Sequence, residues 1–295
     1  MGYLRHLKSC NNFDPHLYTS FRLDGKQVGW ITQQFGKRLQ QEPIFLFGEG
    51  EITLIPELQH FQQRTDALAE VVVKLHRECL INTILNEPYA VTEGPRDEAL
   101  CLIDRAAAVL FGLRSFGQHV NGFVRTGSGI QMWVGRRAKD RFLFPGKLDQ
   151  IVAGGLPWGV TLEENLKKEC YEEAGIAADA AMQAKPVGII RYQLSSERGA
   201  KQDLLYCYDL ELAPDFQPRC TDGEVDEFYL MPLDEIAALV RESDEFKLNC
   251  NLVIIDFLIR HGWLQPHEPD YVELASGLSN PPTIMSPSPT GRGPG

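Results

Sequence analysis

The chain has 295 residues, of which 43% are hydrophobic and 23% are charged, a composition typical of a globular protein. Its length is sufficient for two small domains or one large one. The formal net charge of −11 argues against nucleic acid or an anionic membrane as the main partner, because both demand a basic surface. An anionic phosphate substrate would require a bound cation or a local basic pocket for the same reason.

Residues 1–115 are predicted to form a separate N-terminal α+β domain. The expected elements are a strand–turn–strand unit with Asp24-Gly25 at its turn, one further strand and two helices, over residues 21–31, 51–55, 67–80 and 98–111 respectively. No catalytic constellation lies in this region, and no internal repeat is visible. The sequence therefore places the chemistry further along the chain.

From about residue 116 the pattern changes to short strands. We expect a hairpin at 118–125 and 130–137, further strands at 148–153, 187–195, 204–212 and 227–231, and helices at 161–174, 233–241 and 251–261. Strands that surround two or more helices predict an α+β sandwich over residues 116–265, with a mixed sheet. Residues 266–295 form a C-terminal extension, of which residues 276–295 are rich in Ser, Pro and Gly and are expected to be disordered.

The most informative stretch is an acidic helix that follows the Gly154-Gly155 turn. Thr161 and Glu164 form a capping-box pattern that begins the helix, and Gly175 fits the position that ends it. The apolar stripe that packs the helix against the core repeats every four residues, at Leu162, Leu166, Cys170 and Ala174.

Three carboxylates, on Glu169, Glu172 and Glu173, fall within an arc of roughly 100° on one face of this helix. Hard oxygen ligands on one rigid face suit Mg²⁺, with Mn²⁺ as the second choice. The competing interpretation is a solvated acidic face whose charge is offset by Lys167 and Lys168. Composition alone favours the solvated face, whereas a family resemblance carried by the spacing of the whole stretch favours a metal site.

The stretch resembles the signature of the Nudix hydrolases, in which a glycine is followed at fixed spacing by a glutamate, an Arg-Glu pair, a Glu-Glu pair and a second glycine. The matching positions are Gly154, Glu169, Cys170, Glu172, Glu173, Gly175 and Ile176. Two positions depart from it, because Val160 stands in place of the first glutamate and Lys168 in place of the arginine. These two are commonly ion-pair partners in the family, and losing both together costs little. The departure bears on local stability more than on chemistry.

The resemblance extends to one Nudix subgroup and covers roughly residues 15–275. This subgroup carries an uncharacterised N-terminal domain and is related to the Nudix part of fungal thiamine pyrophosphokinase fusions. The segments that carry the likeness are 24–31, 150–155, 168–174 and 252–262. The resemblance implies hydrolysis of thiamine diphosphate or its damaged oxo and oxy analogues to the monophosphate and phosphate.

The resemblance also implies roles for individual residues. Glu169, Glu172 and Glu173 are expected to hold Mg²⁺, and Glu169 or Glu224 is the candidate base. Glu224 lies in a second acidic cluster, whose competing interpretation is an exposed turn. The candidate substrate-binding residues are Gly154, Gly155, Arg136, Arg137 and Trp158. Trp158 or Trp30 would stack on a substrate ring, although each is more typical of a packing residue.

Three alternatives remain open from the sequence. One is a Nudix hydrolase for ADP-ribose or another nucleoside diphosphate derivative, which a substrate panel would distinguish. Another is a catalytically silent Nudix-fold protein, for which loss of metal carboxylates would be expected. The third is an isomerase of isoprenoid diphosphates, but Cys170 lies on the apolar stripe and is typical of the core. Relatives of this fold are often dimers, so the resemblance also implies a homodimer.

The cysteines indicate the cellular compartment. There are seven of them, they are dispersed along the chain, and no two form a CxxC pair. This pattern predicts reduced thiols in a cytoplasmic protein rather than disulfides, and no histidine lies at zinc-site spacing from a cysteine. We find no secretory signal peptide and no apolar run of about 18 residues, so neither export nor membrane insertion is expected.

Overall fold

The computed structural model describes residues 2–279, which fold into two compact units. The N-terminal unit comprises residues 11–114 and 193–202, and the C-terminal unit comprises residues 2–10, 115–192 and 203–279. The first residues of the chain thus belong to the C-terminal unit. Of the predicted disordered extension, residues 276–279 form the end of a helix, and residues 280–295 lie outside the described residues.

The N-terminal unit contains a four-stranded sheet in the order β2-β1-β4-β3 and a two-stranded sheet, β5-β6. Its strands are β1 (Tyr18–Leu23), β2 (Lys26–Thr32), β3 (Phe45–Phe47), β4 (Glu51–Leu54), β5 (Pro88–Val91) and β6 (Cys101–Asp104). Its helical segments are η1 (Pro15–Leu17), α2 (Gln33–Leu39), α3 (Phe61–Arg77), η2 (Arg96–Glu98) and α4 (Arg105–Ala108). Asp24 and Gly25 form the β1–β2 turn with φ of 50° and 75°, the left-handed values that this tight hairpin turn requires.

Two helix predictions in this unit need correction. Helix α3 begins at Phe61 rather than residue 67, because the Gln63 side chain accepts a hydrogen bond from the His60 N–H at 3.2 Å and caps the helix earlier. The helix expected over 98–111 is wrong for residues 101–104, which pair with β5 as the antiparallel strand β6. Cys101 and Ile103 are buried, whereas the residue after each of them is half-buried, so the two-residue period of a strand prevails there.

The C-terminal unit is built on a seven-stranded sheet in the order β11-β12-β7-β8-β13, with β10 paired to β7 and β9 paired to β8. The strands are β7 (Arg114–Thr126), β8 (Gly129–Arg137), β9 (Leu148–Gln150), β10 (Val152–Gly155), β11 (Lys185–Ser196), β12 (Gly199–Glu211) and β13 (Val225–Pro232). The helices are α1 (Leu4–Cys10), α5 (Leu162–Ala174), α6 (Ala178–Ala181), α7 (Leu233–Glu242), α8 (Cys250–Arg260) and α9 (Tyr271–Ser279).

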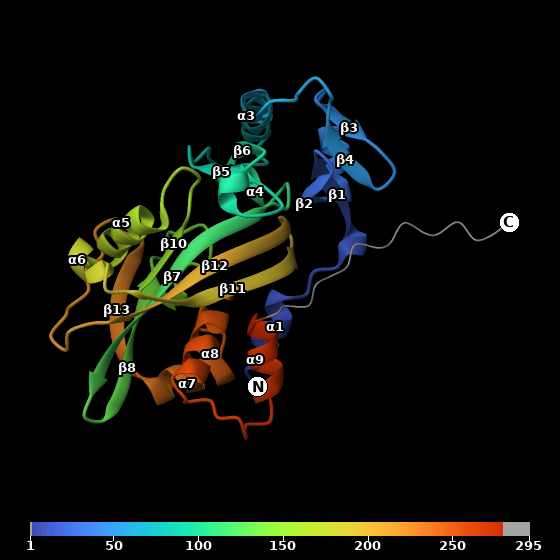
Figure 1. Ribbon diagram of the computed structural model, residues 1–295. Helices are drawn as coiled ribbons and strands as arrows, with labels where there is room; N and C mark the ends of the chain where they lie inside the picture. Colours follow the sequence, from blue (N-terminus) through green and yellow to red (C-terminus); the bar gives the residue numbers. More distant parts are fainter. Residues whose placement is uncertain (1, 280–295) are drawn as a thin grey trace. The chain divides into compact units, whose positions relative to one another are not determined.

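Helices cover both faces of this sheet, as the side-chain alternation along β7 shows. Val120 and Val124 pack with α5 residues in one buried cluster, whereas Phe123 stacks edge-on against Phe257 of α8 at 5.6 Å. Figure 1 shows α5 and α6 on one side of the sheet and α7 and α8 on the other. The predicted α+β sandwich is therefore confirmed.

Helix α8 is tied to the sheet by a polar network around Asp209 of β12. The Asp209 carboxylate accepts hydrogen bonds from Arg260 at 2.6 and 3.0 Å, from His261 at 2.9 Å and from Asn121 at 3.0 Å. Burial alone would raise the pKa of Asp209, but these donors outweigh it and lower the pKa. The network fixes the sheet that carries the acidic helix on its other face.

Candidate metal and active site

Helix α5 begins and ends where its sequence predicts. The Thr161 hydroxyl accepts from the Glu164 N–H at 3.1 Å, and the Glu164 carboxylate accepts from the Thr161 N–H at 3.0 Å, which completes the capping box. Gly175 ends the helix with a φ of 66°. The stripe residues Leu166, Cys170 and Ala174 are buried in the core, so the orientation of the acidic face is fixed by packing.

The three carboxylates of this face differ in burial. Glu173 is 8% exposed and accepts a hydrogen bond from the Ala153 N–H of β10 at 2.8 Å. The Glu169 side chain is 13% exposed and that of Glu172 is 37% exposed. The acidic face therefore extends from the buried Glu173 beside the sheet to the partly exposed Glu172, and each of the three residues offers carboxylate oxygens.

Lys168 lies among these carboxylates. Its Nζ is 3.1 Å from Oε1 of Glu169 and 2.7 Å from Oε2 of Glu172. Burial lowers the pKa of Lys168, but the two glutamates outweigh burial and raise it overall. Since Val160 offers no carboxylate to pair with, the lysine that replaces the signature arginine contacts the acidic cluster itself.

Burial raises the pKa of Glu169, and it raises the pKa of Glu173 to about 8. The Ala153 N–H opposes the shift at Glu173, while the charges of Glu169, Asp149 and Glu224 add to it. Carboxyl groups whose pKa is raised by burial and by neighbouring negative charges are typical of sites that bind a cation or transfer a proton.

The shift at Glu173 predicts that the chelator-treated protein loses stability as the pH rises from about 5 to about 8. The folded carboxyl keeps its proton up to a pKa of about 8, whereas the unfolded chain loses it near a pKa of about 4.3, so the folded state binds more protons in this window. Urea unfolding at both pH values measures the effect. Glu173→Gln retains an acceptor for Ala153 and should flatten this dependence; identical dependence in both proteins contradicts the assignment.

Glu224 belongs to the loop that precedes β13 and contributes to the electrostatics of the same site. Its charge raises the pKa of both Glu169 and Glu173, with a smaller effect than burial. The loop is anchored to α5, because the Thr221 N–H donates to the Glu172 carbonyl at 2.8 Å. Arg141, in the loop between β8 and β9, pairs with Glu224 at 2.7 Å. The second acidic cluster of the sequence is thus brought to the acidic helix.

Gly154 allows the Glu169 carboxylate to lie directly against β10. A Cβ atom at Gly154 would come within 2.5 Å of Oε2 and 2.6 Å of Cγ of Glu169. Gly155 pairs with Gly117 of β7, and its carbonyl accepts from the Asn165 side chain of α5 at 3.0 Å. Close approach of strand and helix therefore depends on the absence of a side chain at position 154.

Gly154→Ala is expected to lower turnover by at least about tenfold, because the added methyl group must displace the Glu169 carboxylate, and overpacking should cost about 1–3 kcal/mol of stability. Steady-state kinetics and urea unfolding measure the two effects. Gly127→Ala is the matched control, since a Cβ at Gly127 meets open space. Equal turnover in both variants would show that the position of the Glu169 carboxylate does not matter for the reaction.

The two arginines proposed from the sequence make protein contacts on opposite faces of β8. Arg136 donates to the Gly146 carbonyl at 2.8 Å, and Arg137 donates to the Asp149 carboxylate at 3.1 Å. Trp158 lies half-buried in the loop between β10 and α5. Trp30 lies in the N-terminal unit, where its buried ring packs 5.2 Å from that of Phe13. Their roles toward a substrate stay predictions.

Two family models match the chain. The model described as "Domain of unknown function (DUF4743)" matches residues 2–115, and the model described as "NUDIX domain" matches residues 116–250. The chain is 41% identical over 284 residues to Nudix hydrolase 24, chloroplastic, of Arabidopsis thaliana, with 95% of this chain and 78% of that protein covered. The chain belongs to the Nudix hydrolase family.

Further similarities cover as much of the chain. Nudix hydrolase 20, chloroplastic, of Arabidopsis thaliana is 38% identical over 291 residues, with 95% of this chain and 78% of that protein covered. An uncharacterized protein of Saccharomyces cerevisiae is 31% identical over 295 residues, with 92% and 85% covered. The chain is thus a Nudix hydrolase, an enzyme that cleaves diphosphate linkages, and the resemblance of its sequence to the Nudix family is confirmed.

Nudix hydrolases generally use divalent metal ions, so we compare how well two groups of side chains could bind one. Besides the α5 carboxylates, the buried side chains of His119, Asp149 and Cys250 place ligand atoms within 4.8 Å of one another. Asp149 is, however, already contacted by Lys247 at 2.9 Å and Arg137 at 3.1 Å. A divalent ion there would add positive charge to a carboxylate that two cations already balance, so the α5 face suits a metal better.

Sequence reasoning missed Arg141 of this Nudix hydrolase, because the residue lies in a loop and belongs to no motif. The sequence offers only a weak signal for it: Arg141 is a basic residue between two predicted strands that precede the Nudix signature.

Among residues 2–279, none of the helices combines the length and apolar character needed to span a membrane.

Proposed function

We propose that this Nudix hydrolase requires Mg²⁺ and cleaves thiamine diphosphate, or its damaged oxo and oxy analogues, to the monophosphate and phosphate. The observation that supports the chemistry is the gathering of Glu169, Glu172 and Glu173 on one face of α5, with Glu224 close enough to perturb two of them. The substrate is proposed from the likeness to the thiamine-related subgroup, and Mg²⁺ from the preference of that ion for carboxylate oxygens.

The three carboxylates of α5 would hold the metal, which when bound neutralises diphosphate charge and lowers the pKa of water. Glu169 or Glu224 would accept the proton of the attacking water. Burial raises the pKa of Glu169 toward the range of a general base, while Glu224 reaches the site from a loop and is a third exposed. Gly154 and Gly155 would let the main chain of β10 lie close to the substrate.

Arg141 is the arginine that we propose contacts a substrate phosphate. Its side chain is 37% exposed and lies 2.7 Å from Glu224, at the rim of the acidic cluster. Arg137 is instead 14% exposed and bound to Asp149, and Arg136 is held by Gly146 and by the ring of Tyr229. Arg136 and Arg137 would then act by shaping the β8–β9 loop, and Trp158 would stack on the organic part of the substrate.

Arg141→Gln is expected to raise KM about tenfold or more and to change kcat less, because a charged hydrogen bond to a phosphate contributes roughly 1.5–3 kcal/mol. Stability should change little, since the Arg141–Glu224 pair is partly exposed. Arg125→Gln is the control, because Arg125 forms a more exposed pair with Glu211 in the same unit. An unchanged KM in Arg141→Gln would contradict a phosphate contact.

The substrate is tested by comparing initial rates on oxythiamine diphosphate, thiamine diphosphate and ADP-ribose with Mg²⁺ present. Fast formation of thiamine-type monophosphates, with slow turnover of ADP-ribose, is the expected result. A preference for ADP-ribose would retain the chemistry and overturn the substrate. No turnover of any of them, together with no uptake of Mg²⁺ in a metal titration, would favour a silent binding protein.

The compartment and assembly are also proposals. The seven cysteines all lie within residues 2–279 and form no disulfide there, which supports a reducing compartment such as the cytoplasm. The two Arabidopsis relatives carry the word chloroplastic in their names, so fractionation of the native cell is the direct test. Sedimentation of the purified chain would test the proposed homodimer.

A further inference from the structure

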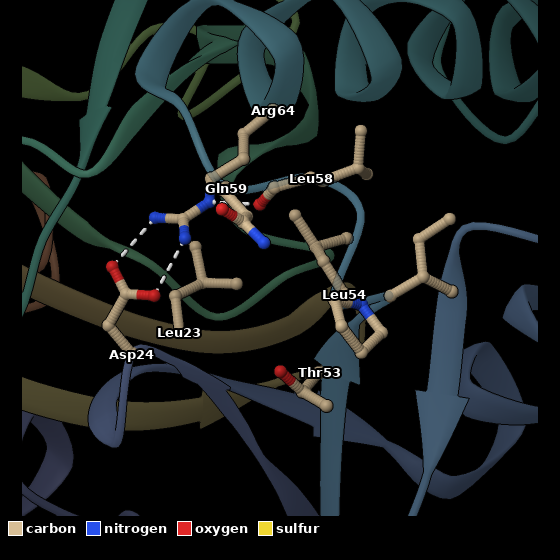
Figure 2. A pocket seen from close by; sticks show the side chains of 9 residues that line it. Leu23, Asp24, Thr53, Leu54, Leu58, Gln59 and Arg64 are labelled. Atoms are coloured by element: carbon tan, nitrogen blue, oxygen red, sulfur yellow. Dashed lines mark hydrogen bonds and ion pairs between the residues drawn. The ribbon is translucent and has the colours of Figure 1, made fainter.

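The N-terminal unit contains a cavity of about 190 Å³, well separated in sequence from the acidic helix. It opens where β1 and β4 diverge, just beyond the last parallel pair, Phe21 with Ile52. Six of its lining residues matter here: Leu23, Asp24, Thr53, Leu54, Gln59 and Arg64. Figure 2 shows Arg64, Gln59 and Asp24 along one side of this cavity and Thr53 on the opposite side.

An ion pair dominates the polar wall of the cavity. Arg64 of α3 donates from both terminal nitrogens to Asp24, at 2.8 and 2.6 Å, and from Nε to the Leu58 carbonyl at 2.8 Å. A guanidinium has five N–H groups, so two remain after these three bonds. The Arg64 side chain is 8% exposed, whereas that of Asp24 is 52% exposed and has further acceptor positions.

The charge of this wall restricts what could bind. A ligand with only a negative charge would compete with Asp24 for Arg64, and a ligand with only a positive charge would compete with Arg64 for Asp24. Either would leave one member of the pair unbalanced, which is costly for a group as buried as Arg64. A ligand that carries both charges side by side leaves both members balanced.

The remaining surface restricts size and polarity. The cavity volume of about 190 Å³ is below the roughly 300–1,000 Å³ of pockets for drug-sized ligands, so the cavity suits a small molecule. Leu23 and Leu54 are buried in the core of the unit and expose little apolar surface to the cavity, so the accessible walls are mainly polar. The Thr53 hydroxyl and the Gln59 amide supply neutral hydrogen-bonding groups.

We propose that the N-terminal unit binds a small zwitterionic amino acid in this cavity. Its ammonium group contacts Asp24, and its carboxylate takes the remaining N–H groups of Arg64. This binding site is separate from the diphosphate chemistry of the C-terminal unit. The N-terminal unit would then respond to the concentration of a free amino acid.

The test uses the full chain and isothermal titration calorimetry with glycine, L-alanine and L-serine. Propionate and propylamine each carry one half of the zwitterionic charge and serve as ligand controls. We expect saturable binding of at least one amino acid and at least tenfold weaker binding of both controls. Binding of propionate or propylamine as tightly as the amino acid, or no binding of any amino acid, would overturn the proposal.

Variants then locate the site. Thr53→Val preserves shape and leaves the ion pair intact, and it should weaken amino-acid binding severalfold. Asp24→Asn should weaken it at least tenfold, with circular dichroism confirming that the variant is folded. Glu51→Gln is the matched control, because Glu51 pairs with half-exposed Arg22 at 3.6 Å and does not line the cavity. Unchanged affinity in both cavity variants would place the ligand elsewhere and overturn the assignment.

Discussion

Replacing Glu172 with glutamine is expected to lower turnover by at least about a hundredfold while the fold stays intact. Glu172 is the most exposed of the three α5 carboxylates, at 37%, and it pairs with Lys168 at 2.7 Å. Removal of a metal-binding carboxylate should cost more than the roughly 10–100-fold typical of residues that only support a ligand. Loss of a partly exposed ion pair costs about 1 kcal/mol or less.

Glu163→Gln is the matched control for this experiment. Glu163 lies in the first turn of the same helix and pairs with Lys167 at 2.5 Å, but it is 58% exposed and six positions before Glu169. Turnover, Mg²⁺ titration and thermal unfolding should be measured for both variants. If Glu172→Gln turns over substrate as fast as Glu163→Gln does, the acidic face of α5 is not the metal site.

Asp149→Asn is expected to destabilise the protein by about 3–5 kcal/mol, the largest change in stability that we predict. Asp149 is 3% exposed and pairs with Lys247 at 2.9 Å and Arg137 at 3.1 Å, whose side chains are 13% and 14% exposed. Burial alone would raise the pKa of Asp149, but Lys247, His119 and Arg137 outweigh it, and the pKa is lowered. The amide leaves two buried cations without a counter-charge.

Urea unfolding measures this effect at constant pH. Glu211→Gln provides the contrast, because Glu211 and Arg125 are both 53% exposed and 3.3 Å apart, and their loss should cost about 1 kcal/mol or less. A similar small loss in Asp149→Asn would indicate that the cations find other partners. In that case the ion pairs of Asp149 with Lys247 and Arg137 would not be needed for the stability of the fold.

Local patterns predicted the acidic helix well. The capping box of Thr161 and Glu164 and the terminal Gly175 are signals that one helix carries within itself, and the structure forms all of them. The hairpin turn at Asp24-Gly25 was similarly predictable from the sequence, because few residue types adopt the positive φ angles that the turn requires. The α+β sandwich followed from the order of strands and helices.

Features that depend on tertiary contacts were not predictable in the same way. Residues 101–104 lie inside a segment that was predicted to be helical, but their pairing with β5 makes them a strand. The approach of the Thr221 loop to the end of α5, and of Arg141 to Glu224, joins positions that are about 50 and 83 residues apart. The buried contacts of Asp149 with Lys247 and Cys250 likewise join residues about 100 apart, beyond any spacing rule.

The position of Lys168 has a consequence for metal binding at the site proposed on α5. With an ammonium 3.1 Å from Glu169 and 2.7 Å from Glu172, the acidic face carries its own counter-ion when the chain folds. A divalent ion that bound at the proposed site would therefore replace a tethered cation rather than enter a cluster of bare anions. Its binding and release would then require movement of the Lys168 side chain but no unfolding of the chain.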